Sequence, residues 1–240
     1  MRHGLFAAAC AGALALTGCP AERANDARPP GTSVRGLPLI LLPVRHAERG
    51  VLAVFLSGDG GWVAVDREVS RILVDSGIPV VGWNSGTYFW NRRTPEEVAA
   101  DLARVIRRYT AEWGIDRVVL AGYSRGADVL PFAANLLPTD LKARVPLLVL
   151  VSPETHTGFE FHLIDLFRDV RRPTDRPMLP ELERLGWTGV LCFYGTEEKD
   201  TACPTLPDSI GTAVPVEGGH HLGGHYREVG ERIVRTIDGR

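Results

Sequence analysis

The sequence lacks a charge imbalance: 27 Lys and Arg residues stand against 29 Asp and Glu residues, for a net charge of -2. It therefore has no broad basic surface of the kind that binds nucleic acid, and we expect no nucleic-acid partner. After the N-terminus it also lacks any apolar run of about 18 residues or more, which excludes a polytopic membrane protein. It shows no internal repeat and no second domain, and its 240 residues suit one domain. The 45% hydrophobic and 23% charged content excludes a wholly disordered chain.

The first 19 residues have the pattern of an export signal with a lipid attachment site. Arg2 and His3 form a short basic region, and the apolar segment Leu5–Leu16 that follows is too short to span a bilayer. Leu-Thr-Gly-Cys at 16–19 then resembles the lipobox of bacterial lipoproteins, in which the signal is removed before a cysteine that carries lipid. A plain secretory signal that is cut nearby, with Cys19 incidental, is the alternative.

This pattern divides the chain into three parts. We expect a lipoprotein signal peptide at residues 1–18, a lipidated Cys19 with a flexible polar tether at residues 19–35, and one folded domain at residues 36–240. A periplasmic protein held at a membrane by its lipid follows from this division. Pro20 is not the Asp that usually signals inner-membrane retention, so the outer membrane is weakly favoured over the inner.

Cysteine is scarce, and the four cysteines sort by position. Cys10 leaves with the signal, and Cys19 would carry the lipid. Cys192 and Cys203 remain in an oxidising compartment, where we expect them to form a disulfide. Two buried thiols are the alternative.

Apolar runs alternate with amphipathic segments through the rest of the chain. The apolar runs are continuous, which is typical of strands buried on both faces of a parallel sheet. We expect strands at 37–44, 51–57, 78–84, 117–122, 146–152, 189–195 and 212–216, and helices at 63–76, 95–113, 125–137 and 225–238. This order predicts a single α/β domain, with a mostly parallel sheet and helices on both faces. The irregular stretch 153–188 is too long for an ordinary connection, so we expect it to be functional, for example as a lid.

A Gly-Tyr-Ser-Arg-Gly segment at 122–126 joins an expected strand to an expected helix. This is the strand–turn–helix setting of the nucleophile elbow of α/β-hydrolases, which presents a serine Oγ above the sheet. Glycines two residues before and after Ser124 would let the strand and the helix approach closely. The pattern therefore predicts an α/β-hydrolase fold in which Ser124 is the nucleophile.

In this fold the acid and then the base follow the serine in the sequence. His220 and His221 lie on a glycine-rich turn after the last expected strand; we prefer His220 as the base, with His221 as the fallback. The acid should lie on the loop after strand 189–195. We favour Asp200 as the acid, because an acid shortly before a proline resembles the usual acid loop. Glu198 is the fallback, and Glu197 is a further candidate.

The turn 57–62, Ser-Gly-Asp-Gly-Gly-Trp, follows an early strand and is rich in glycine. Such a turn supplies an oxyanion-hole donor in this fold, and the residue after the nucleophile supplies the other. We assign the backbone N–H groups of Asp59, Gly60 and Arg125 to the oxyanion hole. The Asp59 side chain would either hydrogen-bond its own turn or meet a cationic group of the substrate.

Seven motifs in this order together resemble the bacterial VirJ/AcvB family, over roughly residues 37–238. They are SGDGGW (57–62), YFW (88–90), RTPEE (93–97), GYSRGADVLP (122–131), FEFH (159–162), YGTEEKDTACP (194–204) and GGHH (218–221). The resemblance implies an α/β-hydrolase exported to the periplasm, with Ser124 as nucleophile. AcvB-like members are similar to aminoacyl-phosphatidylglycerol hydrolases, and VirJ is associated with type IV secretion. Arg125 departs from the pattern, because we expect a more apolar residue there.

The resemblance implies a substrate with an ammonium group, an ester and a phosphate, such as lysyl- or alanyl-phosphatidylglycerol. Asp59, Glu154 or Glu160 could pair with the ammonium, and Arg92, Arg93 or Arg125 with the phosphate. Tyr88 and Trp90 could line a pocket for the substrate, or pack in the core under a loop. A lipid on Cys19 would hold the enzyme at the surface where that phospholipid lies.

We expect no cofactor and no metal, because the histidine pair lacks carboxylate or cysteine partners in the sequence. The expected partners are the aminoacylated phospholipid, the membrane and, through the VirJ resemblance, secretion-system proteins. A serine esterase, lysophospholipase or thioesterase for another substrate class is the alternative function. A binding or chaperone protein of a secretion system, with a vestigial site, is the third.

Overall fold

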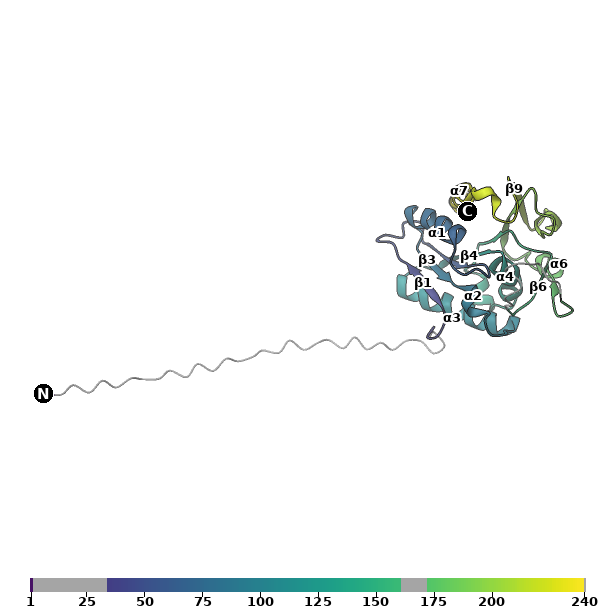
Figure 1. Ribbon diagram of the computed structural model, residues 1–240. Helices are drawn as coiled ribbons and strands as arrows, with labels where there is room; N and C mark the ends of the chain where they lie inside the picture. Colours follow the sequence, from purple (N-terminus) through teal and green to yellow (C-terminus); the bar gives the residue numbers. More distant parts are fainter. Residues whose placement is uncertain (2–33, 161–171, 240) are drawn as a thin grey trace.

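A seven-stranded sheet forms the centre of the computed structural model, which describes Met1, residues 34–160 and residues 172–239 (Figure 1). Its strands, in spatial order, are β1 (Leu39–Leu42), β3 (Val80–Trp83), β2 (Val51–Leu56), β4 (Arg117–Tyr123), β5 (Leu147–Val151), β8 (Gly189–Gly195) and β9 (Gly211–Val216). Only the β1–β3 pair in this sheet is antiparallel. The expected mostly parallel sheet is confirmed.

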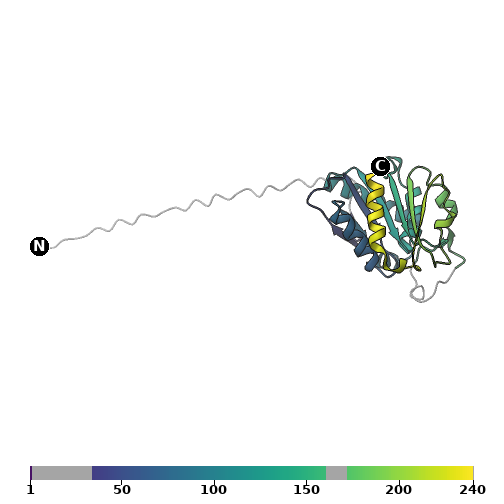
Figure 2. The same ribbon diagram turned by 90° about the horizontal axis from the view of Figure 1, so that it is seen from above.

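Helices cover both faces of the sheet, as the continuous apolar strands require. One face packs against α3 (Pro95–Trp113) and α4 (Arg125–Asn135), and the other against α1 (Ala64–Asp75) and α7 (Tyr226–Asp238). Figure 2 shows α7, in yellow, running along one side of the strands. All six residues of β2 are buried, because this strand lies between two strands and two helical layers.

Helix α3 has the bounds that the sequence predicts, because its local signals agree. The Thr94 side chain accepts a hydrogen bond from Glu97 N (3.2 Å), and the Glu97 carboxylate accepts one from Thr94 N (2.8 Å). Pro95 follows as the first helical residue, and Gly114 ends the helix in the left-handed conformation (φ 64°). Capping box, proline and glycine fix both ends independently of tertiary packing.

Short elements escaped the sequence analysis. They are α2 (Ser85–Tyr88), α5 (Thr139–Lys142), α6 (Leu179–Glu183), the hairpin strands β6 (His156–Thr157) and β7 (Arg176–Pro177), and the 3₁₀ turns η2 (Cys203–Thr205) and η3 (Leu222–Gly224). The β6–β7 hairpin and α6 lie within the stretch 153–188. Elements of two to five residues are too short to show a hydrophobic period.

The expected signal peptide, Cys19 and most of the tether fall in residues 2–33, outside the described residues. Part of the expected lid, 161–171, also lies outside them. Within the described part of the chain, no helix has both the length and the apolar character needed to span a bilayer.

Cys192 and Cys203 form the expected disulfide, with Cα atoms 5.4 Å apart and 11 residues of sequence separation. Closing a loop of this length lowers the entropy of the unfolded chain and contributes about 3 kcal/mol to stability. Cys192 lies inside β8, so the bridge draws the chain back from the end of that strand toward its middle.

Candidate active site

Ser124 lies in a strained turn between β4 and α4. Its φ of 51° is rare for a residue with a side chain, and its backbone N–H donates to the Val151 carbonyl (2.9 Å). A Cβ on Gly122 would lie 2.4 Å from the backbone of Gly126, and one on Gly126 would lie 2.2 Å from the Leu56 oxygen. The two glycines are therefore required for the crossing, as the nucleophile-elbow pattern predicts.

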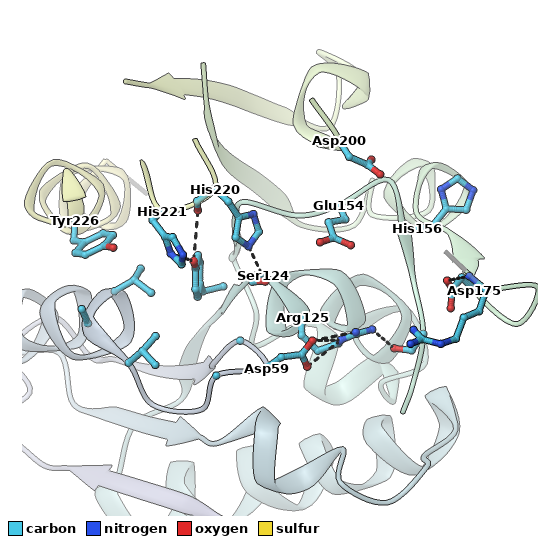
Figure 3. Close-up of a pocket in the computed structure, with 18 residues that line it drawn as sticks. Asp59, Ser124, Arg125, Glu154, His156, Asp175, Asp200, His220, His221 and Tyr226 are labelled. Carbon is cyan, nitrogen blue, oxygen red and sulfur yellow. Dashed lines mark hydrogen bonds and ion pairs between the residues drawn. The ribbon is translucent and has the colours of Figure 1, made fainter. Parts of the chain in front are cut away.

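Ser124, His220 and Glu198 form a continuous hydrogen-bonded series at the carboxyl edge of the sheet. Figure 3 shows the Ser124–His220 pair. His220 Nε2 lies 2.9 Å from Ser124 Oγ, and His220 Nδ1 lies 2.7 Å from Glu198 Oε1. The Glu198 side chain is only 5% exposed, whereas the His220 ring is 35% exposed. A base that touches both the hydroxyl and a buried carboxylate is the arrangement that activates a serine nucleophile.

The structure corrects the prediction of Asp200 as the acid. Glu198, the fallback, contacts His220, while the Asp200 carboxylate accepts hydrogen bonds from the Thr155 backbone N–H (3.1 Å) and hydroxyl. Beyond Lys199 the loop is hydrogen-bonded to the segment after β5, because Ala202 N donates to the Pro153 carbonyl (2.9 Å). Glu198 stays near the strand end, where its second oxygen accepts from Gly195 N (2.7 Å).

His220, the preferred base, lies against Ser124, whereas its neighbour His221 points elsewhere. His221 Nδ1 lies 2.7 Å from the Tyr123 hydroxyl, on the other side of the elbow. The Ser152 hydroxyl donates to the His220 carbonyl (3.0 Å), which fixes the backbone of the base from behind. The fallback assignment of His221 as base is therefore wrong for this conformation.

Glycines bring the acid loop and the base loop together. A Cβ on Gly195 would lie 2.2 Å from the Gly219 oxygen, and a Cβ on Gly218 would lie 2.4 Å from Gly223 N. Gly218 also has a φ of 105°, which side-chain-bearing residues rarely adopt. This close approach holds Glu198 within hydrogen-bonding distance of His220.

A cavity of about 730 Å³ opens over Ser124. Its wall combines the elbow, the glycine turn after β2, the histidine turn and residues of the stretch 153–188. The lining residues are Gly58, Asp59, Gly60, Val63, Ala64, Val65, Tyr123, Ser124, Arg125, Glu154, His156, Gly158, Arg172, Asp175, Asp200, His220, His221 and Tyr226. Sequence reasoning missed His156, Arg172 and Asp175, because the segment that carries them has no periodic pattern and its one motif, FEFH (159–162), contains none of them.

The glycine turn after β2 runs directly beside the nucleophile. A Cβ on Gly58 would lie 3.2 Å from the Ser124 Cβ, and the turn is closed by a hydrogen bond from Gly61 N to Gly58 O (3.0 Å). Asp59 and Gly60 are the two residues enclosed by this turn, and both line the cavity. The backbone that we expect to form the oxyanion hole is thus next to the serine.

The Asp59 side chain pairs with a cation of the protein rather than with its own turn, and its contact with a cationic group of the substrate stays a prediction. Its carboxylate binds the guanidinium of Arg125, with the Asp59 oxygens 3.2 Å from Nε and 3.0 Å from Nη2 (Figure 3). Arg125 Nη1 also donates to the Gly158 carbonyl (2.8 Å). Burial alone would lower the pKa of Arg125, but the Asp59 carboxylate outweighs it and raises that pKa. Arg125 therefore ties the glycine turn, the elbow and residue 158 together, which explains a charged residue at this position.

Two further carboxyl groups lie on the other side of Arg125. Asp128 is buried and accepts a hydrogen bond from Glu154 N (2.8 Å). Burial and the neighbouring Glu154 charge raise the pKa of Asp128, while Arg125 opposes that rise. Glu154 is the carboxyl group of this pair that lines the cavity (Figure 3).

The remaining substrate-binding predictions do not fit the cavity over Ser124. Tyr88 is buried, with its ring 4.8 Å from that of Trp83 and its hydroxyl donating to Asp101 (2.6 Å), so core packing prevails. Trp90 is 62% exposed and lies outside the cavity wall. Glu160 lines a smaller cavity beside it. In residues 34–160 and 172–239, no cluster of three His, Cys, Asp or Glu side chains could hold a metal ion.

Solved structures with the same fold are hydrolases by name. Est1E from Butyrivibrio proteoclasticus is 14% identical, with a TM-score of 0.60 over 85% of this chain and 96% of that one. The esterase Pf2001 from Pyrococcus furiosus is 10% identical, with a TM-score of 0.59 over 84% of this chain and 91% of that one. An alpha-beta serine hydrolase homologue from Coxiella burnetii is 19% identical, with a TM-score of 0.56 over 82% and 90%. These likenesses establish the α/β-hydrolase fold.

The protein therefore has an α/β-hydrolase fold in which a serine, a histidine and a glutamate are joined by hydrogen bonds. A family model described as bacterial virulence protein (VirJ) matches residues 50–240. The chain belongs to the VirJ family, as the motifs predict, and family and fold together support a hydrolase function. No curated protein sequence matches the chain.

Proposed function

We propose that the protein is a serine hydrolase that cleaves carboxylic esters, with Ser124 as nucleophile, His220 as base and Glu198 as acid. The observation that carries this proposal is the unbroken hydrogen-bonded series from Ser124 Oγ through His220 to the buried Glu198 carboxylate. Each distance lies within the range over which a proton is transferred or an imidazole is held.

In the proposed mechanism each of the three side chains has its own role. His220 Nε2 takes the proton of Ser124 Oγ as that oxygen attacks the ester carbonyl, and returns it to the leaving alcohol oxygen. Glu198 accepts the Nδ1–H of His220, fixing the tautomer and stabilising the imidazolium. The acyl group stays on Ser124 until a water molecule, deprotonated by His220, attacks it and regenerates the serine.

The oxyanion formed during attack would lie between the elbow and the glycine turn. Backbone N–H groups of Asp59, Gly60 and Arg125 are the donors we assign to it. The Asp59–Arg125 ion pair supports this assignment, because it neutralises a carboxylate that would otherwise repel the developing charge. It also holds the glycine turn to the residue after the nucleophile.

The substrate we propose is an aminoacyl-phosphatidylglycerol, such as the lysyl or alanyl form, cleaved at its aminoacyl ester. Charge around Ser124 supports this class: four acids and two arginines line the cavity. Asp59 is neutralised by Arg125, and Asp200 and Asp175 accept hydrogen bonds from Thr155 and from Arg172 N. Glu154 lines the same cavity, and we assign it to the ammonium of an aminoacyl group.

We propose that the enzyme works in the periplasm, held at a membrane through Cys19. The disulfide between Cys192 and Cys203 supports export, because such bonds persist in oxidising compartments. The Leu-Thr-Gly-Cys sequence at 16–19 is the basis for the lipid anchor. An anchored enzyme would meet a phospholipid headgroup at high local concentration.

The test is release of amino acid from lipid vesicles. Purified protein is incubated with vesicles of lysyl- or alanyl-phosphatidylglycerol, and lipids and free amino acid are quantified by mass spectrometry, with Ser124→Ala as the control. We expect phosphatidylglycerol and free amino acid with the native protein alone. Absence of release from a protein whose serine still reacts with a fluorophosphonate would retain the hydrolase and exclude this substrate.

A further inference from the structure

A second cavity, of about 140 Å³, adjoins the one over Ser124 and has the opposite charge balance. Among described residues, four arginines and two acids line it, whereas four acids and two arginines line the larger cavity. Gly158, Arg172 and Asp175 belong to both walls, so the two cavities are neighbours. A ligand that extended across both would have its positive end near Ser124 and its negative end among the arginines.

Arg93 is the most informative residue of the smaller cavity, which we call the arginine cavity. Its guanidinium carbon lies 4.7 Å from the centre of the Tyr88 ring, and its backbone N–H donates to the Phe159 carbonyl (2.8 Å). Its side-chain Nε is buried and has no hydrogen-bond partner among the described residues. Buried N–H groups without an acceptor are uncommon. Arg93 also lines the arginine cavity, so an anion held there would meet its guanidinium.

The other features of the arginine cavity agree with an anion. Thr94 and Pro95, which begin the 19-residue helix α3, also line it. One of its two acids is engaged in its own turn, since Asp175 Oδ2 accepts from Arg172 N (2.5 Å). Arg176, which belongs to β7, is another of the lining arginines.

We propose that the arginine cavity binds the phosphate of the substrate's leaving group. In an aminoacyl-phosphatidylglycerol, the ammonium and the phosphodiester lie on opposite sides of the scissile ester, separated from each other by the acyl carbons and a three-carbon glycerol. That order matches the acid-rich wall around Ser124 followed by the arginine cavity. Planar guanidinium groups suit phosphate oxygens because they donate two parallel hydrogen bonds. This inference rests on the proposed function, and it names the determinant that separates phosphate-bearing esters from neutral ones.

The test compares two soluble esters that differ only in the phosphate: alanyl-glycerol and alanyl-glycerol phosphate. The ratio of their kcat/KM values is measured for the native protein, Arg93→Gln, Arg176→Gln and the control Arg107→Gln. Arg107 lies on the same helix as Pro95, about 18 Å along its axis. We expect the native protein to prefer the phosphate ester by about tenfold or more, and each cavity variant to reduce that ratio about fivefold to tenfold. Arg107→Gln should leave the ratio unchanged.

Three results would overturn the inference. One is a native ratio near one, and another is a ratio that Arg93→Gln and Arg176→Gln leave unchanged. The third is inhibition by inorganic phosphate as strong as by glycerol phosphate, which would assign the cavity to free phosphate. A general folding defect lowers both rates and leaves the ratio intact, so it cannot imitate the expected result.

Failure of the proposed function would be distinguishable. If the native protein hydrolyses neither ester, binding of glycerol phosphate is measured by calorimetry on the same four proteins. Binding that weakens in Arg93→Gln and Arg176→Gln, but not in Arg107→Gln, would support the anion site without the esterase. Absence of binding would reject both.

Discussion

At the scale of single residues, the choice between Glu198 and Asp200 shows what loop geometry decides. Both carboxylates follow β8 within five residues, and both line up in sequence with the acid of an α/β-hydrolase. Only Glu198 remains at the strand end, where its carboxylate accepts a hydrogen bond from Gly195 N. The Asp200 carboxylate instead accepts one from Thr155 N. The sequence supplies both candidates, and the hydrogen bonds of the folded loop distinguish them.

We predict that Glu198→Gln lowers kcat on a neutral ester by a factor on the order of 10³–10⁴, because an amide cannot stabilise the imidazolium and favours the wrong tautomer. Asp200→Asn should change kcat on the same ester by less than about threefold. Steady-state kinetics with p-nitrophenyl acetate would measure both. A larger loss in Asp200→Asn than in Glu198→Gln would contradict the assignment.

Asp66 is a second residue whose surroundings affect its chemistry, here its pKa. It is fully buried in α1, where one carboxylate oxygen accepts from Val63 N (2.8 Å) and the other has no partner among the described residues. Burial raises its pKa to about 7. The folded protein therefore holds this proton more tightly than the unfolded chain does.

The consequence is a loss of stability as pH rises. A raised pKa in the folded state stabilises it at low pH, and this contribution disappears as pH rises from the ordinary carboxyl range to about 7. Asp66→Asn removes the charge, so we predict that its free energy of unfolding, relative to the native protein, increases by about 2–3 kcal/mol between pH 5 and pH 8. Urea unfolding at the two pH values measures it. A pH-independent difference would show that Asp66 is ionised throughout.

At the scale of elements, the elbow depends on a crossing that tolerates no side chain. We predict that Gly126→Ala destabilises the protein by about 2–3 kcal/mol and reduces esterase activity strongly, because its Cβ would lie 2.2 Å from the Leu56 oxygen. Gly186→Ala is the matched control, since nothing lies within 4 Å of a Cβ at that position. Thermal unfolding and ester hydrolysis compare the two. Equal effects would mean that the crossing is not the cause.

The elements show where sequence reasoning succeeds. Helix α3 could be placed to the residue, because Thr94, Pro95 and Gly114 signal its ends locally. β8 could be placed as well, because its apolar run is continuous and bounded by glycines. The β6–β7 hairpin could not be predicted, since its two-residue strands pair through tertiary contacts. Tyr88 was equally ambiguous: an aromatic run after a strand suits both a pocket and the core, and the bond to Asp101 decides for the core.

At the scale of the whole molecule, the site follows from the parallel sheet. The carboxyl ends of β2, β4, β8 and β9 meet at one edge, and these strands precede the glycine turn, Ser124, Glu198 and His220, respectively. Ser124 and His220 could be predicted, because the Gly-Tyr-Ser-Arg-Gly segment marks the elbow and the base follows the last strand in the sequence. The Asp59–Arg125 pair could not be predicted, because it joins two turns 66 residues apart with no motif in common.

Ser124 is the activated nucleophile of the proposed mechanism, and covalent labelling measures that reactivity directly. The native protein is treated with a fluorophosphonate, digested and mapped by mass spectrometry, beside Ser124→Ala and His220→Ala. We predict a single phosphonate adduct on the peptide that contains Ser124, absent from Ser124→Ala and formed at least about a hundredfold more slowly in His220→Ala. A folded native protein that forms no adduct, or forms it on another residue, would exclude Ser124 as the activated nucleophile.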